Sequence, residues 1–283
     1  MTTWLVTGGT GQLGSEVVAL LAGRGEVVVA PTAAELDITD AAAVRAFVDA
    51  TGPEVVVGCA AYTAVDAAES DVAAAAALNA DAPRHLALAC AQVGARMVQV
   101  STDYVFSGDA HEPYAEDAPT GPRTVYGRTK LAGEQAVLEV LADSGYVVRT
   151  AWLYGPAGSN FVRTMLRLAA DRPSLDVVDD QWGQPTSARD LAERLVELAG
   201  SAAPPGIYHG TNAGATTWNG FAREVFRLSG LDPERVRTTS SADLVRPAPR
   251  PAYSVLGHDR WALAGLAPMR PWQDALTAAL PFG

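Results

Sequence analysis

The 283-residue sequence is poor in cysteine and in basic side chains, and each scarcity excludes a class of protein. Cys59 and Cys90 form no CxxC pair, so we expect neither a disulfide framework nor a zinc site. The formal net charge is -11, and no dense run of lysine and arginine is present to neutralise a phosphate backbone. We therefore predict a cytoplasmic protein that has no nucleic-acid partner.

Long apolar runs are also missing. The longest stretch without a charged residue, at about residues 200–222, is interrupted by Pro204 and Pro205, so we do not expect it to span a bilayer. The first residues lack the basic segment and the long apolar core of a signal peptide. The histidines show no HxH or HxxxH pairing. We expect no membrane partner and no metal site.

Short apolar segments alternate with helical patterns in the first 154 residues. This alternation predicts an α/β fold with a doubly wound parallel sheet of the Rossmann type. Asp40 should cap the second helix, and Pro83 should kink or divide the third. The expected strands are 3–7, 27–30, 55–60, 97–101 and 146–150, and the expected helices follow Gly14 and cover about 41–50, 74–93 and 129–141.

The pattern changes after Tyr154, where proline-rich segments separate shorter elements. We interpret residues 1–154 as an NAD(P)-binding Rossmann domain and residues 155–283 as mostly a smaller C-terminal α/β lobe that binds substrate. A helix near residues 188–198 is expected to return to the main sheet.

Three glycines, Gly8, Gly11 and Gly14, follow the first strand and open the first helix. Glycines in this context permit a tight turn and let a pyrophosphate approach the helix N-terminus. A plain glycine loop is the alternative interpretation. The GxxGxxG spacing is typical of short-chain dehydrogenases.

Tyr126 and Lys130 are four residues apart at the start of a predicted helix and therefore share one side of it. A nearby ammonium group favours the phenolate, which would make the tyrosine a better proton donor near neutrality. The segment 101–106 ends the fourth strand, at the sheet edge where ligands bind. Taken singly, these patterns also fit a solvated helix face and a strand-end turn.

Together the motifs resemble the extended short-chain dehydrogenases/reductases, and within them the dTDP-4-dehydrorhamnose reductase family. The dehydratases of the same superfamily carry an acidic residue where Tyr104 stands here, so the resemblance favours a reductase. It spans nearly the whole chain, in the segments 11–14, 36–39, 60–66, 101–106, 126–134, 149–155, 160–161, 180–186 and 250–251.

The resemblance implies reduction of the C4 ketone of a dTDP-4-keto-6-deoxyhexose by NADPH, with dTDP-4-dehydro-β-L-rhamnose as the expected substrate. Thr102, Tyr126 and Lys130 would be catalytic: Thr102 fixes the carbonyl, Tyr126 protonates it, and Lys130 holds the nicotinamide ribose and lowers the pKa of the phenol. The implied cofactor-binding residues are Gly8, Gly11, Gln12, Leu13, Gly14, Asp37, Ile38, Ala60, Ala61, Tyr62, Tyr126 and Lys130. The implied substrate-binding residues are Val65, Thr102, Tyr104, Tyr126, Trp152, Asn160, Gln184 and Arg250.

Several alternatives stay open on the sequence alone. The second strand ends without an acidic residue for a ribose hydroxyl and without an arginine for a 2′-phosphate, so NADH is possible beside the preferred NADPH. Val65 and Trp152 could belong to the core, and Arg250 could tie the small lobe to the main domain. The chain could also reduce another dTDP-4-keto-6-deoxy sugar, act as an epimerase or dehydratase, or be a non-catalytic NADP-binding regulatory subunit. The sequence allows a monomer or a homodimer and leaves a role for magnesium undecided.

Overall fold

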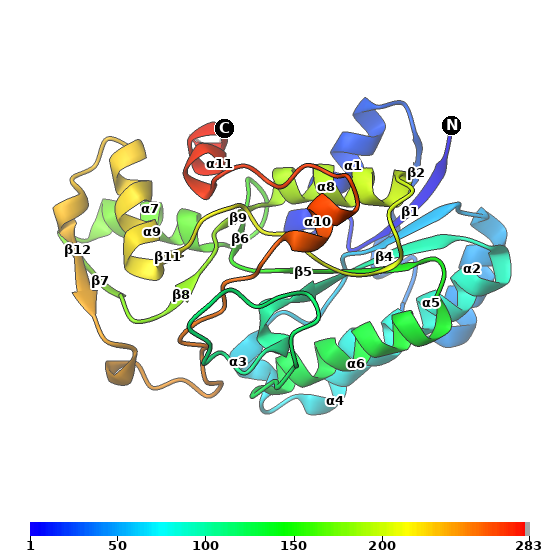
Figure 1. Cartoon of the computed structure of the whole chain (residues 1–283), viewed down its shortest axis with the longest axis horizontal. Helices are drawn as coiled ribbons and strands as arrows, with labels where there is room; N and C mark the ends of the chain where they lie inside the picture. The colour runs from blue at the N-terminus through cyan, green and yellow to red at the C-terminus, as the bar shows by residue number, and fades with distance from the viewer. Residues whose placement is uncertain (281–283) are drawn as a thin grey trace.

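A computed structural model describes residues 1–280; the last three residues of the expected lobe lie outside the described part. Its centre is a parallel sheet of six strands in the order β10-β5-β4-β3-β1-β2 (Figure 1). The prediction of a doubly wound α/β fold is therefore confirmed. The strands are β1 (Thr3–Thr7), β2 (Val27–Val29), β3 (Val55–Gly58), β4 (Arg96–Thr102), β5 (Gly145–Thr150) and β10 (Gly206–His209).

Helices cover both faces of this sheet because its strands are apolar on both sides. On one face, α1 (Gln12–Gly23) and α8 (Ala188–Gly200) pack together over the side chains of Val55 and Val57 (Figure 1). On the other face, Val56 packs beneath the remaining helices of the domain. These helices are α2 (Ala41–Thr51), α5 (Ala82–Val93) and α6 (Val125–Val140).

The helix expected at residues 74–93 is divided as Pro83 requires. A short helix α4 (Val72–Ala76) passes into a π-helical segment at Ala77–Asp81, and α5 then begins with Pro83 in its first turn. The π-helical segment lies just before Pro83, where the proline nitrogen has no hydrogen to donate to the regular helical ladder. The π-helical segment turns Asn79 inward, where its side chain hydrogen-bonds the backbone N–H and C=O of Tyr62 at 2.9 and 3.1 Å. This contact fixes the segment that follows β3.

Two elements differ from the sequence predictions. Helix α6 begins at Val125, four residues before the predicted start, because the Thr124 hydroxyl accepts a hydrogen bond from the N–H of Gly127 at 3.0 Å. Tyr126 therefore lies in the first turn of this helix. Strand β10 was not predicted and pairs with β5, although it lies in the part of the chain expected to form the lobe.

A smaller lobe lies at the left in Figure 1. Helices α7 (Phe161–Asp171), α9 (Trp218–Leu228) and α11 (Trp272–Ala279) share an apolar core with the parallel pair β7 (Leu175–Val178) and β12 (Val236–Thr239). The short elements of the whole chain are α3 (Val65–Ala68), α10 (Asp259–Leu263), β6 (Leu153–Tyr154), β8 (Trp182–Gly183), β9 (Thr186–Ser187), β11 (Thr216–Thr217) and the 3₁₀ turns Asp103–Val105, Pro233–Arg235 and Ser241–Asp243. No helix within residues 1–280 has the length and apolarity needed to cross a membrane.

Candidate active site

A cavity of about 760 Å³ lies at the carboxyl ends of the central strands, between the sheet and the smaller lobe. Ligands of doubly wound folds bind at this edge of the sheet. Of the residues that the sequence analysis singled out, thirteen line the cavity: Gly8, Gly11, Gln12, Leu13, Ala60, Ala61, Val65, Thr102, Tyr104, Tyr126, Lys130, Trp152 and Arg250.

The glycine loop forms one end of the cavity and leaves no room for side chains. A Cβ atom on Gly8 would lie 2.7 Å from the backbone nitrogen of Ala60, and one on Gly14 would lie 2.1 Å from the carbonyl oxygen of Gly8. Gly8 also has φ +69°, a left-handed conformation that favours glycine. Helix α1 begins at Gly11 without a side-chain cap, so its first N–H groups can bind an anion. The loop therefore fits the pyrophosphate of a dinucleotide.

Lys130 lines the cavity, and its ammonium group donates a hydrogen bond of 2.6 Å to the carbonyl of Val100. Burial lowers the pKa of Lys130 to about 8, and the carboxylate of Glu134 opposes this shift. Glu134 is itself buried and accepts hydrogen bonds from Arg149 at 2.7 and 3.0 Å and from the hydroxyl of Ser101. Although it is paired with Arg149, the Glu134 carboxylate lies one helical turn from the lysine and favours its charged form.

Tyr126 faces the cavity from the first turn of α6, beside Tyr104. Burial raises the pKa of Tyr126 to about 12, and the neighbouring Thr102 hydroxyl offsets part of the rise. The net direction is opposite to the one expected from the Tyr126–Lys130 spacing, because loss of hydration dominates. Tyr126 thus keeps its proton at neutral pH.

Thr102 ends β4 and lies between Tyr126 and a buried carboxyl group. Its hydroxyl donates a hydrogen bond of 2.9 Å to Asp103 Oδ1 and accepts one of 3.2 Å from the backbone N–H of Tyr104. Asp103 is 3% exposed, and burial raises its pKa to about 6 against the effect of the hydrogen bond from Thr102. Asp103 belongs to the predicted strand-end segment 101–106, and no role was predicted for it.

Trp152 forms a wall of the cavity in a strained conformation. Its φ of +47° is the one positive value for a residue other than glycine within residues 1–280. The indole ring stacks on Trp218, with centroids 3.5 Å apart and planes 10° apart. A Cβ on Gly183 would lie 2.4 Å from the ring of Trp152, so this glycine is required for the arrangement. Trp218 was not predicted as a site residue, because it lies far along the chain in the smaller lobe and no local motif marks it.

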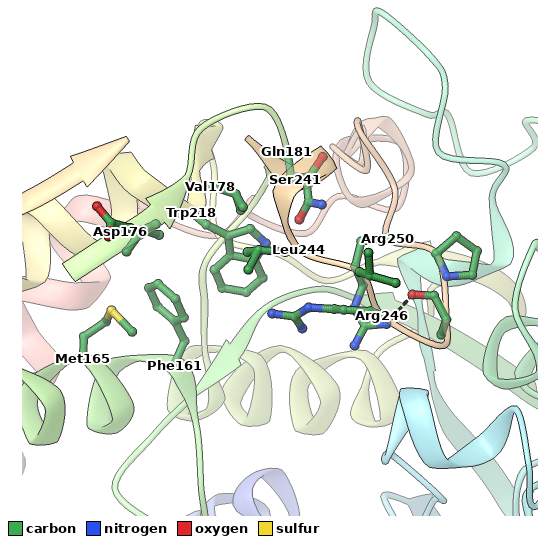
Figure 2. Close-up of a pocket in the computed structure, with 14 residues that line it drawn as sticks. Phe161, Met165, Asp176, Val178, Gln181, Trp218, Ser241, Leu244, Arg246 and Arg250 are labelled. Carbon is green, nitrogen blue, oxygen red and sulfur yellow. Dashed lines mark hydrogen bonds between the residues drawn. The ribbon is translucent and has the colours of Figure 1, made fainter. Parts of the chain in front are cut away.

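A second cavity of about 600 Å³ adjoins the first, and the two share Gln181, Trp218 and Arg250 as lining residues. Figure 2 shows Phe161 and Met165 at one end of it and the guanidinium groups of Arg246 and Arg250 at the other. The second cavity therefore has an apolar, aromatic end and a cationic end.

Arg250 connects the smaller lobe to the main domain, which is the alternative role considered for it from the sequence. Its guanidinium group binds both carboxylate oxygens of Asp66 in α3, at 2.8 and 2.7 Å. This pair lowers the pKa of Asp66 and attaches the segment 246–251 to the Rossmann part of the chain. Arg246 is exposed and faces the second cavity (Figure 2).

Other residues singled out from the sequence do not line either cavity and have contacts of their own. Asn160 caps α7 by accepting a hydrogen bond of 3.1 Å from the N–H of Arg163. Gln184 is buried and bonds the backbone of Leu256 in both directions. Asp37 accepts hydrogen bonds from Thr39 at 2.7 and 2.9 Å. The residues outside the cavity linings are Gly14, Asp37, Ile38, Tyr62, Asn160 and Gln184.

Comparison with known proteins places this geometry in a family. The pattern that defines the RmlD substrate-binding-domain family matches residues 1–281. The chain belongs to this family. A dTDP-4-dehydrorhamnose reductase of Streptomyces griseus is 60% identical over 282 residues, which cover 98% of this chain and 93% of that protein. A dTDP-4-keto-6-deoxy-D-glucose reductase of Streptomyces niveus is 53% identical and covers 99% of this chain and 96% of its own length.

Solved structures of family members have the same fold. A dTDP-4-dehydrorhamnose reductase of Bacillus anthracis in complex with NADP superposes with a TM-score of 0.95 at 37% identity, and the match covers 98% of each chain. One from Clostridium acetobutylicum superposes with a TM-score of 0.93 at 41% identity, again over 98% of each chain. The resemblance inferred from the motifs is therefore confirmed.

Proposed function

We propose that this chain reduces the C4 ketone of a dTDP-4-keto-6-deoxyhexose with NADPH, and that dTDP-4-dehydrorhamnose is its substrate. The observation that carries the proposal is the convergence of Thr102, Tyr126 and Lys130 on one cavity that also holds the glycine loop. The names of the relatives from Streptomyces support the class of substrate, and the NADP complex of the relative from Bacillus anthracis supports the cofactor.

The Rossmann part of the chain would hold the cofactor. The N–H groups at the start of α1 bind its pyrophosphate, the backbone of Ala60 and Ala61 lies beside it, and Lys130 binds the ribose next to the reacting ring. When bound, the reduced nicotinamide supplies the hydride. We extend this cofactor-binding part beyond residues 1–154 to include α8 and β10, because both pack on the central sheet.

Tyr126 would supply the proton. Because its pKa is raised to about 12, the phenol stays protonated until negative charge develops on the ketone oxygen, and it then donates. Lys130, whose pKa is about 8, is mostly cationic at pH 7 and stabilises the phenolate that remains. Trp152 and Tyr104 would enclose the sugar ring.

The second cavity would take the nucleotide half of the substrate. Phe161 and Trp218 offer aromatic faces to a pyrimidine base, and Arg246 with Arg250 offers guanidinium groups to a diphosphate. Arg250 keeps its bond to Asp66, so Arg246 is the better candidate for direct phosphate contact.

The proposal is tested by mixing the purified protein with NADPH and dTDP-4-dehydrorhamnose and following the loss of NADPH absorbance. We expect stoichiometric oxidation of NADPH and formation of a 4-hydroxy sugar. Binding of NADPH without oxidation would indicate a regulatory subunit, and conversion of the sugar without added reductant would indicate an epimerase or dehydratase.

A second candidate substrate follows from the relative that is named a dTDP-4-keto-6-deoxy-D-glucose reductase. That ketone is presented on the same nucleotide, so the two cavities accommodate it by the same argument. Comparing kcat/KM for the two ketosugars under identical conditions distinguishes the candidates.

A further inference from the structure

Strand β2 has no acidic residue at its end, but a carboxylate further along the chain is held back toward that strand. Glu35 lies in the turn that follows β2. Its Oε2 accepts a hydrogen bond of 2.8 Å from the backbone N–H of Thr32 and one of 2.9 Å from the Thr32 hydroxyl. Glu35 lines neither cavity, and the proposed reaction does not use it.

The turn lies beside the glycine loop. A Cβ atom added to Gly9 would lie 2.9 Å from the Cβ of Ala30, so the chain that leaves β2 touches the loop that fits a pyrophosphate. Leu36 and Ile38 are buried in the cluster against which Ala60 packs, and Ala60 lines the first cavity. The turn is therefore fixed at the carboxyl edge of the sheet, between the ends of β2 and β3.

This position has a known meaning in dinucleotide-binding folds. The adenosine ribose lies near the end of the second strand, where an acidic residue about 20 positions after the glycine motif accepts the 2′-hydroxyl of NAD, or an arginine accommodates the 2′-phosphate of NADP. Glu35 has this separation from Gly14, and residues 27–40 contain neither lysine nor arginine. The charge of the turn therefore favours a hydroxyl group over a phosphate.

The two other carboxylates of the turn are held toward α2 instead. Asp37 accepts hydrogen bonds from the N–H and the hydroxyl of Thr39 at 2.9 and 2.7 Å, and Asp40 caps α2. Both hydrogen bonds to Glu35 use Oε2, so Oε1 of this exposed side chain can accept a further one. The bonds from Thr32 also lower the pKa of Glu35, so the carboxylate is ionised at neutral pH.

We propose that Glu35 sets the selectivity between NADPH and NADH: its carboxylate accepts the 2′-hydroxyl of NADH and repels the 2′-phosphate of NADPH, and Thr32 positions it. The inference rests on the proposed function, which makes the bound cofactor a nicotinamide dinucleotide. It makes NADH a usable reductant beside NADPH, because residues 27–40 offer no cation to the additional phosphate.

The test is the ratio of the dissociation constants of NADH and NADPH, measured on the whole chain by fluorescence titration without substrate. Glu35→Gln removes the charge but keeps an oxygen that accepts the bonds from Thr32, so the turn is preserved. We expect NADPH to bind about tenfold more tightly to this variant than to the wild type, because its 2′-phosphate no longer faces a carboxylate. NADH should bind slightly more weakly, because an amide oxygen is a weaker acceptor than a carboxylate.

Salt distinguishes an effect of charge from an effect of shape. Repulsion between exposed charges is screened as ionic strength rises, so the gain for NADPH in Glu35→Gln should shrink between about 0.01 and 1 M salt. A gain caused by a changed shape of the turn would persist. Thr32→Val keeps the charge of Glu35 but removes one of the two bonds that hold it, so its gain for NADPH should be smaller than that of Glu35→Gln.

Glu54→Gln is the matched control for the loss of charge. Glu54 is also exposed, and its Oε1 accepts a hydrogen bond of 3.2 Å from the N–H of Thr3, which begins β1 at the opposite edge of the sheet. This variant should keep the wild-type ratio of dissociation constants. Thermal unfolding of each variant shows whether it is folded.

A folded Glu35→Gln variant with the wild-type ratio, a gain for NADPH that persists at 1 M salt as at low salt, or an equal gain in Glu54→Gln overturns the inference. A wild type that binds NADPH about 10³-fold more tightly than NADH also overturns it, because such a preference requires a cation at the 2′-phosphate. A wild type that binds both cofactors but oxidises neither with dTDP-4-dehydrorhamnose overturns the proposed function instead, and the ratio of dissociation constants then still tests Glu35.

Discussion

At the scale of single residues, burial decides how the candidate catalytic groups behave. Tyr126 and Lys130 have their pKa values shifted toward the neutral form by loss of hydration, upward for the phenol and downward for the ammonium group. Residue spacing alone could place the two side chains on one side of a helix. It could not show that burial would control both pKa values, because burial depends on the helices and loops packed around the two side chains.

Replacing Tyr126 by phenylalanine tests the general acid. The ring and its edge contact with Tyr104 are kept while the transferable proton is lost, so kcat should fall by about 10²-fold or more. The dissociation constant for NADPH, measured by fluorescence titration, should change little. Turnover close to the wild type would show that another group donates the proton.

The loss of activity at alkaline pH should report the deprotonation of Lys130. Because burial lowers its pKa to about 8, the ammonium form is lost as pH rises through about 8, and activity should fall with it. The guanidinium group of Lys130→Arg stays charged there, so this variant should be slower at neutral pH but free of the loss near pH 8. An unchanged alkaline fall in Lys130→Arg would assign the titration to a different residue.

At the scale of elements, the sequence predicted most strands of the central sheet but missed strand β10 and the residue Trp218 of the candidate site. Alternating apolar segments located five of the six strands, and the glycine turn located the start of α1. Strand β10 was missed because it is only four residues long and follows a proline pair in a part of the chain without clear periodicity. Trp218 was missed for a different reason: its stacking on Trp152 is a contact between the two parts of the chain.

The strained turn at Trp152 makes Gly183 an indirect determinant of substrate binding. Gly183→Ala would place a Cβ 2.4 Å from the indole ring, so Trp152 must move into the cavity or lose its stacking on Trp218. We expect KM for the dTDP-ketosugar to rise by about tenfold or more, since one lost stacked pair and the strain each cost about 1 kcal/mol or more. NADPH affinity should be unaffected.

Gly200→Ala is the control for this substitution. Gly200 ends α8, and an added Cβ there meets no atom within 4 Å, so steady-state kinetics should equal those of the wild type. A Gly183→Ala variant with normal KM would show that the position of Trp152 does not limit substrate binding.

At the scale of the whole molecule, two adjoining cavities divide the proposed work. The sheet edge carries the glycine loop and the candidate catalytic residues, and the smaller lobe carries an apolar end and a pair of arginines. The motifs from the sequence include thirteen of the residues that line the first cavity, because short segments at strand ends build much of it. The second cavity joins α7, α9 and the segment 241–250, which no local pattern connects.

This division predicts that binding energy from the nucleotide positions the ketone for reduction. The most direct test is the ratio of kcat/KM for dTDP-4-dehydrorhamnose to that for the free 4-keto-6-deoxyhexose, measured by NADPH oxidation for the wild type and Arg246→Ala. We predict a ratio of about 10³ or more for the wild type, equivalent to about 4 kcal/mol, and a clearly smaller ratio for Arg246→Ala. Equal kcat/KM values for the two sugars in the wild type would contradict the assignment of this chain as a reductase of nucleotide-linked sugars.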